Sequence, residues 1–464
     1  MYRFVLAAAS ALALVSCTTV GPDYKAPSPA SAEPSAPAPF ASAASPAFTG
    51  DEPPGRWWSL FRDSVLDGLV AQALAANTDL RVAAANLAQA RAVLRETRAG
   101  RLPTTGLSGG ATYANQPGPG GAEPELSAGF DVGYQLDLFG RIRRATEASR
   151  ADVEAVQAAF DVARITVAAE TARAYADACS SGRQLQVARE SVRIQEETFD
   201  LTRRLVAGGR GTALDTGQAG ALMEQVRAQV PTLEAERRAA LYRLAVLTGR
   251  PPADFPPVVA TCVTPPSLSQ PVPVGDGASL LARRPDIRRA ERELAAATAR
   301  IGVATAELYP DISLGLSVGS TASSIGGLAS GSGFRFGLGP LISWTFPNRT
   351  VARSRIAQAE AGAQAALARF DGTWLGALEE TETALTRYAR ELDRAAILRR
   401  ARANSLEAAR VARLRYRAGR ESFQIVLDAE RSLSQIEADL ARSEAQLSTN
   451  LVSVFLALGG GWQG

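Results

Sequence analysis

The stretch DLRVAAANLAQARAVLRETRAGRLP at Asp79–Pro103 recurs 207 residues later as DIRRAERELAAATARIGVATAELYP at Asp286–Pro310. Nine of the 25 aligned positions are identical, and both copies end in proline. The same offset relates Phe139 to Phe346, so the two intervening stretches have equal length. Solenoid repeats have periods of roughly 20–50 residues, so this period indicates a duplicated half-molecule instead.

Each half is expected to contain a helix, a hairpin, a long helix, a turn and another helix. The long helices are expected at 141–205 and 350–416, because neither stretch contains proline and both are rich in Ala, Arg, Glu and Gln. About 65 helical residues span roughly 100 Å. Helices much longer than about 25 residues are typical of coiled coils and related assemblies.

The predicted hairpins, at 104–137 and 311–345, alternate between apolar and polar residues. One face of the first hairpin carries apolar side chains, namely Leu107, Ala111, Tyr113, Leu126, Ala128, Phe130, Val132, Tyr134 and Leu136. The second carries Ile312, Leu314, Leu316, Val318, Phe334, Phe336, Leu338, Ile342 and Trp344 on the equivalent face. Such strands suit a membrane barrel. An ordinary half-buried sheet gives the same alternation, so both interpretations stay open here.

Strand number constrains the membrane interpretation. Lipid cannot satisfy an open sheet edge, so membrane strands must close into a barrel. The smallest membrane barrels have about eight strands, so four strands per chain would require several chains to share one barrel.

Composition excludes much of enzymology. The 464 residues include 50 Lys+Arg and 47 Asp+Glu, no histidine and three cysteines, and Lys25 is the single lysine. Without histidine there is no Ser-His-Asp or Cys-His catalysis, and three cysteines are too few for a zinc cage. The near-balance of charge argues against nucleic acid as a partner. We therefore expect no enzyme, no cofactor and no metal.

The N-terminus predicts export. Arg3 precedes an apolar run from Phe4 to Val15, which is typical of a signal peptide over residues 1–16. Leu14-Val15-Ser16-Cys17 resembles the bacterial lipobox, in which the cysteine becomes lipid-modified, for example with palmitate. A plain secretory signal with an incidental cysteine is the alternative. Thr18 stands where Asp would resemble an inner-membrane retention signal, so the resemblance implies an outer-membrane anchor.

The mature chain divides into three predicted parts. Residues 17–56 form a lipid-anchored extended segment, because 26–56 are rich in Pro, Ala and Ser and such a composition buries little apolar surface. Residues 57–262 and 263–464 are the two structural repeats. With Cys17 acylated, Cys179 and Cys262 remain in an oxidising compartment, and we hypothesise a disulfide between them. Two buried free thiols are the alternative.

The chain resembles outer-membrane efflux proteins, in particular the lipoprotein branch that serves resistance-nodulation-division (RND) pumps. Matching motifs occur in the same order along essentially the whole chain. They are Val20-Gly21-Pro22-Asp23-Tyr24, Trp57-Trp58, Asn77-Thr78-Asp79-Leu80, Leu138-Phe139-Gly140-Arg141, Leu247-Thr248-Gly249, Arg283-Arg284-Pro285-Asp286 and Ala299-Arg300-Ile301-Gly302-Val303-Ala304.

This resemblance implies an α+β membrane protein. Three chains would build a 12-stranded outer-membrane β-barrel, four strands each, continuous with a long periplasmic barrel of α-helices. It also implies the partners, which are two further copies of the chain, a periplasmic adaptor protein, an inner-membrane RND transporter and outer-membrane lipid. The channel would be passive, and the pump would supply the energy.

The resemblance also implies site residues. Two helix–turn–helix tips would contact the adaptor, and their marker residues are Leu205, Gly208, Gly209, Tyr416 and Gly419. The glycines suit left-handed helix ends in any case. Asp428 matches a position whose carboxylates ring the periplasmic mouth. Gln424 departs from the leucine common in relatives, which puts a leucine-type seal in doubt. The alternative for Asp428 is a solvated helix cap beside Arg431.

The leading hypothesis is a passive outer-membrane channel of a tripartite efflux pump in a Gram-negative bacterium. It would export drugs or other toxic small molecules and contribute to antibiotic resistance. Two alternatives remain open, namely an exit duct for protein secretion driven by an ABC transporter and a lipid-anchored periplasmic coiled-coil scaffold without a pore.

Overall fold

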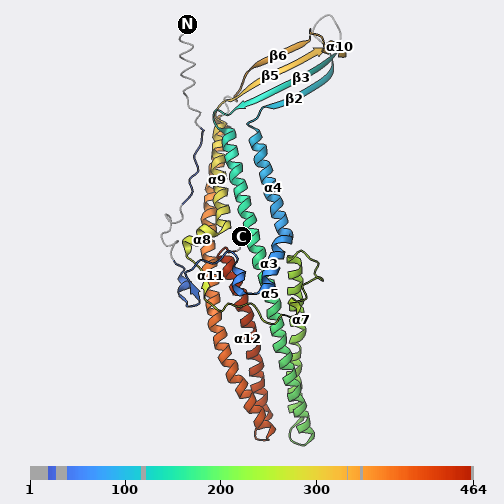
Figure 1. The fold of residues 1–464 in the computed structure, drawn as a ribbon, viewed down its shortest axis with the longest axis vertical. Helices are drawn as coiled ribbons and strands as arrows, with labels where there is room; N and C mark the ends of the chain where they lie inside the picture. The colour runs from blue at the N-terminus through green and yellow to red at the C-terminus, as the bar shows by residue number, and fades with distance from the viewer. Residues whose placement is uncertain (1–18, 28–38, 116–121, 332, 345–348, 461–464) are drawn as a thin grey trace. The chain divides into compact units, whose positions relative to one another are not determined.

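The structure is a computed structural model that describes residues 19–27, 39–115, 122–331, 333–344 and 349–460 (Figure 1). The first half contains η1 (Ala41–Ala44), β1 (Phe48–Thr49), η2 (Trp57–Phe61), α3 (Ser64–Ala76), α4 (Thr78–Ala99), β2 (Thr104–Asn115), β3 (Ala122–Leu136), α5 (Arg141–Ala207), α6 (Ala213–Arg227), α7 (Gln229–Leu247) and η3 (Val259–Thr261). The second contains β4 (Val272–Pro273), α8 (Gly277–Arg283), α9 (Pro285–Ala306), β5 (Asp311–Ala322), α10 (Ile325–Leu328), β6 (Phe334–Ser343), α11 (Arg349–Arg417) and α12 (Phe423–Ala457).

The duplication read from the sequence is present in the elements. Helices α4 and α9 each have 22 residues and strands β2 and β5 each have 12, with both pairs displaced by 207 positions. The long helices have 67 and 69 residues, close to the predicted 141–205 and 350–416. Phe346, which marked the offset in the sequence, lies outside the described residues.

Four strands form one antiparallel sheet in the order β2-β3-β5-β6. Thr104 pairs with Gly133 in the first hairpin, and Asp311 pairs with Ser343 in the second. Strand β6 is therefore displaced from β3 by 210 residues rather than 207. Side chains alternate between the two faces of a strand with a period of two. Because 210 is even, the apolar positions of β3 correspond to apolar positions of β6, and both sets lie on the same face of the sheet.

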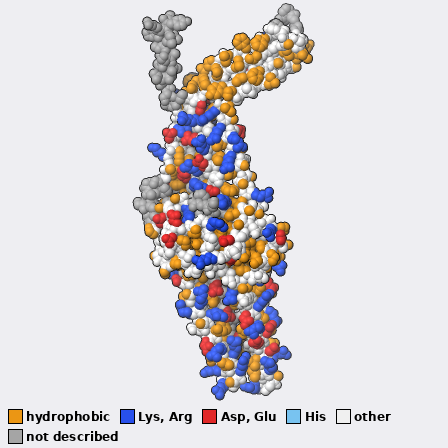
Figure 2. Space-filling view, in the orientation of Figure 1, with side chains coloured by type: hydrophobic (Ala, Val, Ile, Leu, Met, Phe, Trp, Pro, Cys, Tyr) orange, Lys and Arg blue, Asp and Glu red, His pale blue; other side chains and the backbone are white. Residues whose placement is uncertain are grey.

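The sheet leaves large apolar side chains in contact with solvent. Leu107, Tyr113, Phe336 and Leu338 are each at least 69% exposed in the single chain. Figure 2 shows hydrophobic side chains over the visible face of these strands. A contiguous apolar surface of this kind marks a membrane or protein contact.

The chain forms two compact units, and each unit draws on both halves of the sequence. Unit 1 comprises residues 1–28, 85–158 and 288–372, and unit 2 comprises 29–84, 159–287 and 373–464. Helices α4, α5, α9 and α11 each contribute residues to both units.

The main hydrophobic core lies in unit 2 and is called the large core below. Trp57 is fully buried and stacks on Phe455 with ring centroids 4.9 Å apart. Phe40 and Phe48 from the Pro/Ala/Ser-rich segment are buried in the same core, and Phe48 pairs with Val272 as β1 joins β4. Phe40 and Phe48 therefore make this part of the segment a component of the unit 2 core, and the expectation from composition that it buries little apolar surface is wrong there.

Among the described helices, none combines the length and apolar character required to span a bilayer.

Candidate functional site

Two helix–turn–helix tips lie in unit 2, where α5 turns into α6 and α11 turns into α12 (Figure 1). Gly209 and Gly419 end the long helices in the left-handed conformation, with φ of +76° and +71°. Thr212 then starts α6 with a capping box, in which its hydroxyl accepts from the Asp215 amide at 3.3 Å. Both tips thus have locally specified turns, as the sequence predicted.

A second hydrophobic cluster joins the two tips and is called the tip core below. It consists of buried Ala219, Leu222, Val226, Ala412, Tyr416, Phe423, Val426 and Leu427, with Leu205 packed against it. The rings of Tyr416 and Phe423 lie 5.6 Å apart. Leu205 and Tyr416 therefore direct their side chains into the protein, whereas Gly208, Gly209 and Gly419 are exposed.

The predicted gate residues lie on an exposed face of α12. The Gln424 amide donates to the Asp428 carboxylate over 3.1 Å, one helical turn apart. Asp428 is five residues past Phe423, the first residue of α12, so its position is not that of a helix cap. Ile425 is 47% exposed beside them, so the face presents an amide, a carboxylate and an apolar side chain together.

A buried carboxylate that the sequence analysis did not identify lies on the opposite side of α12. Glu430 is 1% exposed, accepts from the Gln195 amide of α5 at 2.7 Å and lies 3.2 Å from the Arg413 guanidinium of α11. Burial raises the pKa of the Glu430 carboxyl, and Arg413 and Gln195 oppose that rise. Gln195 is 235 residues away in sequence, so no local pattern could have revealed this contact.

In unit 1, the segment after Cys17 is held between α5 and α9. Arg144 is 4% exposed at its side chain, and its guanidinium donates to the Val20 and Gly21 carbonyls and to Asp23. The distances are 3.0, 3.1 and 2.8 Å. Gly21 has φ of +87° and lies against the backbone of Gly302, where a side chain would collide. Cys17 and the predicted signal peptide at residues 1–16 lie outside the described residues.

The structure joins Cys179 on α5 to Cys262 by a disulfide, with Cα atoms 4.7 Å apart. Cys179 is fully buried in the large core, and Cys262 packs against it from the segment after η3. Arg237 of α7 donates to the Ala260 carbonyl beside this bond. The segment from η3 onward is thereby fixed to α5.

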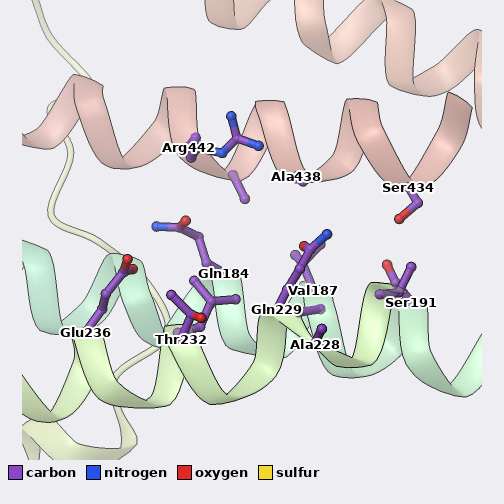
Figure 3. A pocket seen from close by; sticks show the side chains of 14 residues that line it. Gln184, Val187, Ser191, Ala228, Gln229, Thr232, Glu236, Ser434, Ala438 and Arg442 are labelled. Atoms are coloured by element: carbon purple, nitrogen blue, oxygen red, sulfur yellow. The ribbon is translucent and has the colours of Figure 1, made fainter. Parts of the chain in front are cut away.

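A cavity of about 410 Å³ lies in unit 2 between α5, the α6–α7 junction and α12. Figure 3 shows Ser191 and Ser434 facing it from opposite helices, with Gln184, Gln229 and Arg442 farther along. Small side chains such as Ala188, Ala438 and Ala441 leave this space. Arg442 pairs with Asp439 at 3.0 Å on its own helix. This lining provides no nucleophile–base pair.

Within the part of the chain that the structure describes, no cluster of three or more His, Cys, Asp or Glu side chains could hold a metal ion.

Comparison with known proteins gives one consistent result. A family model described as outer membrane efflux protein matches residues 69–250 and 278–460. The chain is 34% identical over 416 residues to outer membrane protein OprJ of Pseudomonas aeruginosa, covering 88% of this chain and 86% of that protein. It is 30% identical over 453 residues to nodulation protein T of Rhizobium leguminosarum bv. trifolii, covering 97% and 96%.

Solved structures agree. The outer-membrane channel OprN superposes with a TM-score of 0.89 at 36% identity, covering 96% of this chain and all of that one. The open-state MtrE outer membrane channel of Neisseria gonorrhoeae gives a TM-score of 0.83 at 26% identity, covering 96% and 99%. These similarities confirm the predicted fold class, an internally duplicated α+β membrane protein of the kind in which a trimer combines a helical barrel with a β-barrel.

Proposed function

Because the chain belongs to the outer membrane efflux protein family, we propose that it is the passive outer-membrane channel of a tripartite efflux pump. The observation that carries this proposal is the open four-stranded sheet with its exposed apolar face. Strands β2 and β6 each have one unpaired edge, which lipid cannot satisfy. Three copies would close these edges into a barrel of twelve strands.

The exported compounds are proposed to be small toxic molecules such as drugs. Antibiotic efflux pump outer membrane protein ArpC of Pseudomonas putida is 30% identical over 466 residues, and its name supports this class. Cation efflux system protein CusC of Escherichia coli is 29% identical over 408 residues. The channel would transmit what the pump selects, so it needs no catalytic group of its own.

The proposed partners follow from the same role. Two further copies complete a homotrimer, a periplasmic adaptor meets the tips, and an inner-membrane RND transporter supplies energy through the adaptor. Acylated Cys17 would anchor the chain in the outer membrane of a Gram-negative bacterium, after removal of residues 1–16. Residues 17–56 would then be the lipid-anchored segment, and 57–262 and 263–464 the two repeats.

We propose that Asp428 and Gln424 line the periplasmic mouth. Their exposed position on α12 leaves both side chains available to face a symmetry axis. Three carboxylates around an axis favour cations and repel anions. Gln424 holds the Asp428 carboxylate at one helical turn, so the constriction would be polar rather than apolar.

The native mass in mild detergent tests the channel. Full-length protein should migrate near three times the 48.7 kDa chain mass, corrected for the cleaved signal, and should conduct ions in planar bilayers. A Cys17→Ala protein that stays monomeric and soluble without detergent, and does not conduct, would refute the shared barrel and favour a scaffold without a pore.

Single-channel conductance tests the gate. Asp428→Ala should increase conductance or the uptake of large antibiotics, because it removes one carboxylate per chain from the mouth. Asp393→Ala is the matched control, since that exposed carboxylate lies on α11 and pairs with Arg390. Equal conductance of both variants and the unmodified channel would exclude Asp428 from the gate.

A further inference from the structure

The turns of both tips contain the same dipeptide in the same backbone geometry. Gly209-Arg210 and Gly419-Arg420 each follow a long helix, and the glycine has positive φ in each. The Arg210 amide donates to the Leu205 carbonyl at 2.8 Å, and the Arg420 amide donates to the Arg415 carbonyl at 2.9 Å. The Gly209 amide donates to the Val206 carbonyl and the Gly419 amide to the Tyr416 carbonyl, so each end is a Schellman motif.

Neither the geometry of a helix C-terminus nor the helix dipole favours arginine at these two positions. The residue after the left-handed glycine of a Schellman motif frequently makes an apolar contact with the preceding turn. In addition, Arg210 and Arg420 each lie three residues before the first residue of the next helix, Ala213 or Phe423. A cation there opposes the helix dipole, which favours negative charge at an N-terminus.

Arginine predominates among the charged residues of the two turns, and the carboxylates Asp200, Asp215 and Glu421 directly flank them. Every charged residue in 201–214 and 411–420 is an arginine, seven in all. Arg413 pairs with Glu430, and Arg203 and Arg415 lie 4.0 and 3.8 Å from carboxylates.

The other four arginines form what we call the cationic cap, namely Arg204, Arg210, Arg417 and Arg420. All four are exposed, and among the described residues none has a carboxylate within ion-pair distance. Figure 2 shows Lys and Arg side chains at this end of unit 2.

The two tips share this cap. The Arg210 guanidinium from the first tip lies directly against Gly419 of the second, where any side chain would collide with it. The dipole of the preceding helices accounts for Arg204 and Arg417, which lie in their last turns. Arg210 and Arg420 have no such structural explanation, so a binding role accounts for them better.

We propose that the cationic cap binds carboxylate groups on the periplasmic adaptor, which makes an acidic contact surface the recognition feature of that partner. This inference rests on the proposed efflux function. Guanidinium groups bind carboxylates through two parallel hydrogen bonds, which gives geometric selectivity. The exposed turns carry Gly208, Gly209, Gly211 and Gly419, so a partner backbone can approach the arginines closely.

The test uses the full-length acylated channel in nanodiscs and two synthetic helical hairpins. The hairpins share one sequence, except that one carries glutamates around its turn and the other carries glutamines. The channel variant R210L/R420L places apolar residues after the glycines. R193L/R410L is the matched control, because it removes two arginines from the same long helices where each already pairs with neighbouring glutamates.

We expect the glutamate hairpin to bind at least about tenfold more tightly than the glutamine hairpin, because charge complementarity adds to the shared contacts. Its affinity should fall as salt rises from about 0.05 to 0.3 M, because exposed pairs are screened. R210L/R420L should abolish the preference, and R193L/R410L should keep it.

Equal binding of the two hairpins, or binding of neither, overturns the proposal. So does binding to purified peptidoglycan that R210L/R420L loses while hairpin binding is unchanged, since the arginines would then serve the cell wall. Ion conductance of the same preparations tests the channel function separately from the acidic partner. A conducting channel without charge-dependent binding refutes only the acidic partner, and a preparation that does not conduct refutes the channel.

Discussion

The large core and the tip core involve the same helices α5, α11 and α12 but differ in how they are held. The large core contains Trp57 stacked on Phe455 and a disulfide between Cys179 and Cys262. The tip core is smaller and lies beside a buried carboxylate, Glu430, shared by three helices. Between them lies a cavity of about 410 Å³ bordered by small side chains.

This difference indicates that the two cores of unit 2 differ in stability. Close-packed aromatic interiors and a covalent bond resist rearrangement. A buried ionic contact gains little net stability, because desolvation offsets its attraction. We therefore expect the large core to set the stability of unit 2 and the tip core to open at lower free energy. Opening at the tip is what a gate at Asp428 would need.

The largest expected effect comes from Trp57→Ala. Removing a fully buried indole that stacks on Phe455 should lower the free energy of unfolding by about 3–5 kcal/mol, because it leaves a cavity. Urea unfolding followed by far-ultraviolet circular dichroism, which reports helix content, measures this loss of stability. Phe423→Ala in the tip core should instead raise hydrogen exchange mainly around the tips. If both substitutions destabilised unit 2 uniformly, the two cores would not be separable.

A smaller loss is expected when Cys179 and Cys262 are both replaced by alanine. The disulfide closes 83 residues, and chain entropy assigns such a loop about 4.5 kcal/mol, of which about 2–4 is typically observed. Thermal unfolding with and without reductant measures the loss. Reductant should destabilise the unmodified protein and leave the double variant unchanged. Two free thiols in denatured, unreduced protein would show that the bond is absent.

The pH dependence of the tip core should be modest and have a defined sign. Burial raises the pKa of Glu430, so the packed tip binds this proton more tightly than an opened tip in which the carboxyl is hydrated. Tip packing should therefore be strongest at acidic pH and weaken as pH rises through the raised pKa. Hydrogen exchange at residues 423–433 should rise a few-fold from about pH 5 to pH 8, beyond intrinsic exchange.

Glu430→Gln provides the control for that titration. It keeps the shape and a hydrogen-bonding group beside Gln195 but cannot ionise. The excess pH dependence should vanish at the tip, while exchange in the large core stays as before. Persistence of the pH effect in Glu430→Gln would assign it to a group other than Glu430.

The smallest effect is expected from R210L/R420L on stability. Leucine can make the apolar contact of a Schellman end, and its neutrality removes a cation from each following helix N-terminus. The melting temperature should rise by about one or two degrees. A fall would mean that the contact of Arg210 with Gly419 stabilises the tips, and would weaken the comparison between the two cores.

Sequence reasoning succeeded where a period or a local rule applied. The 207-residue offset anticipated α4 and α9, and alternation anticipated strands β2, β3, β5 and β6. Left-handed glycines marked both turns. It missed contacts between residues far apart in sequence, such as Gln195 with Glu430 and Arg144 with the Val20 carbonyl. Only the folded arrangement of helices brings these residues together.

The offsets of the strands extend beyond one chain. Ala128 of β3 pairs with Ser320 of β5 at the seam between the two hairpins. Residues of β6 correspond to residues of β3 plus 210, and residues of β2 correspond to residues of β5 minus 207. If β6 of one copy pairs with β2 of the next as β3 pairs with β5, Leu338 therefore lies opposite Tyr113 of that next copy. The internal seam is thus a template for the intermolecular one, and the trimer would have approximate sixfold symmetry built from an ancestral half-length chain.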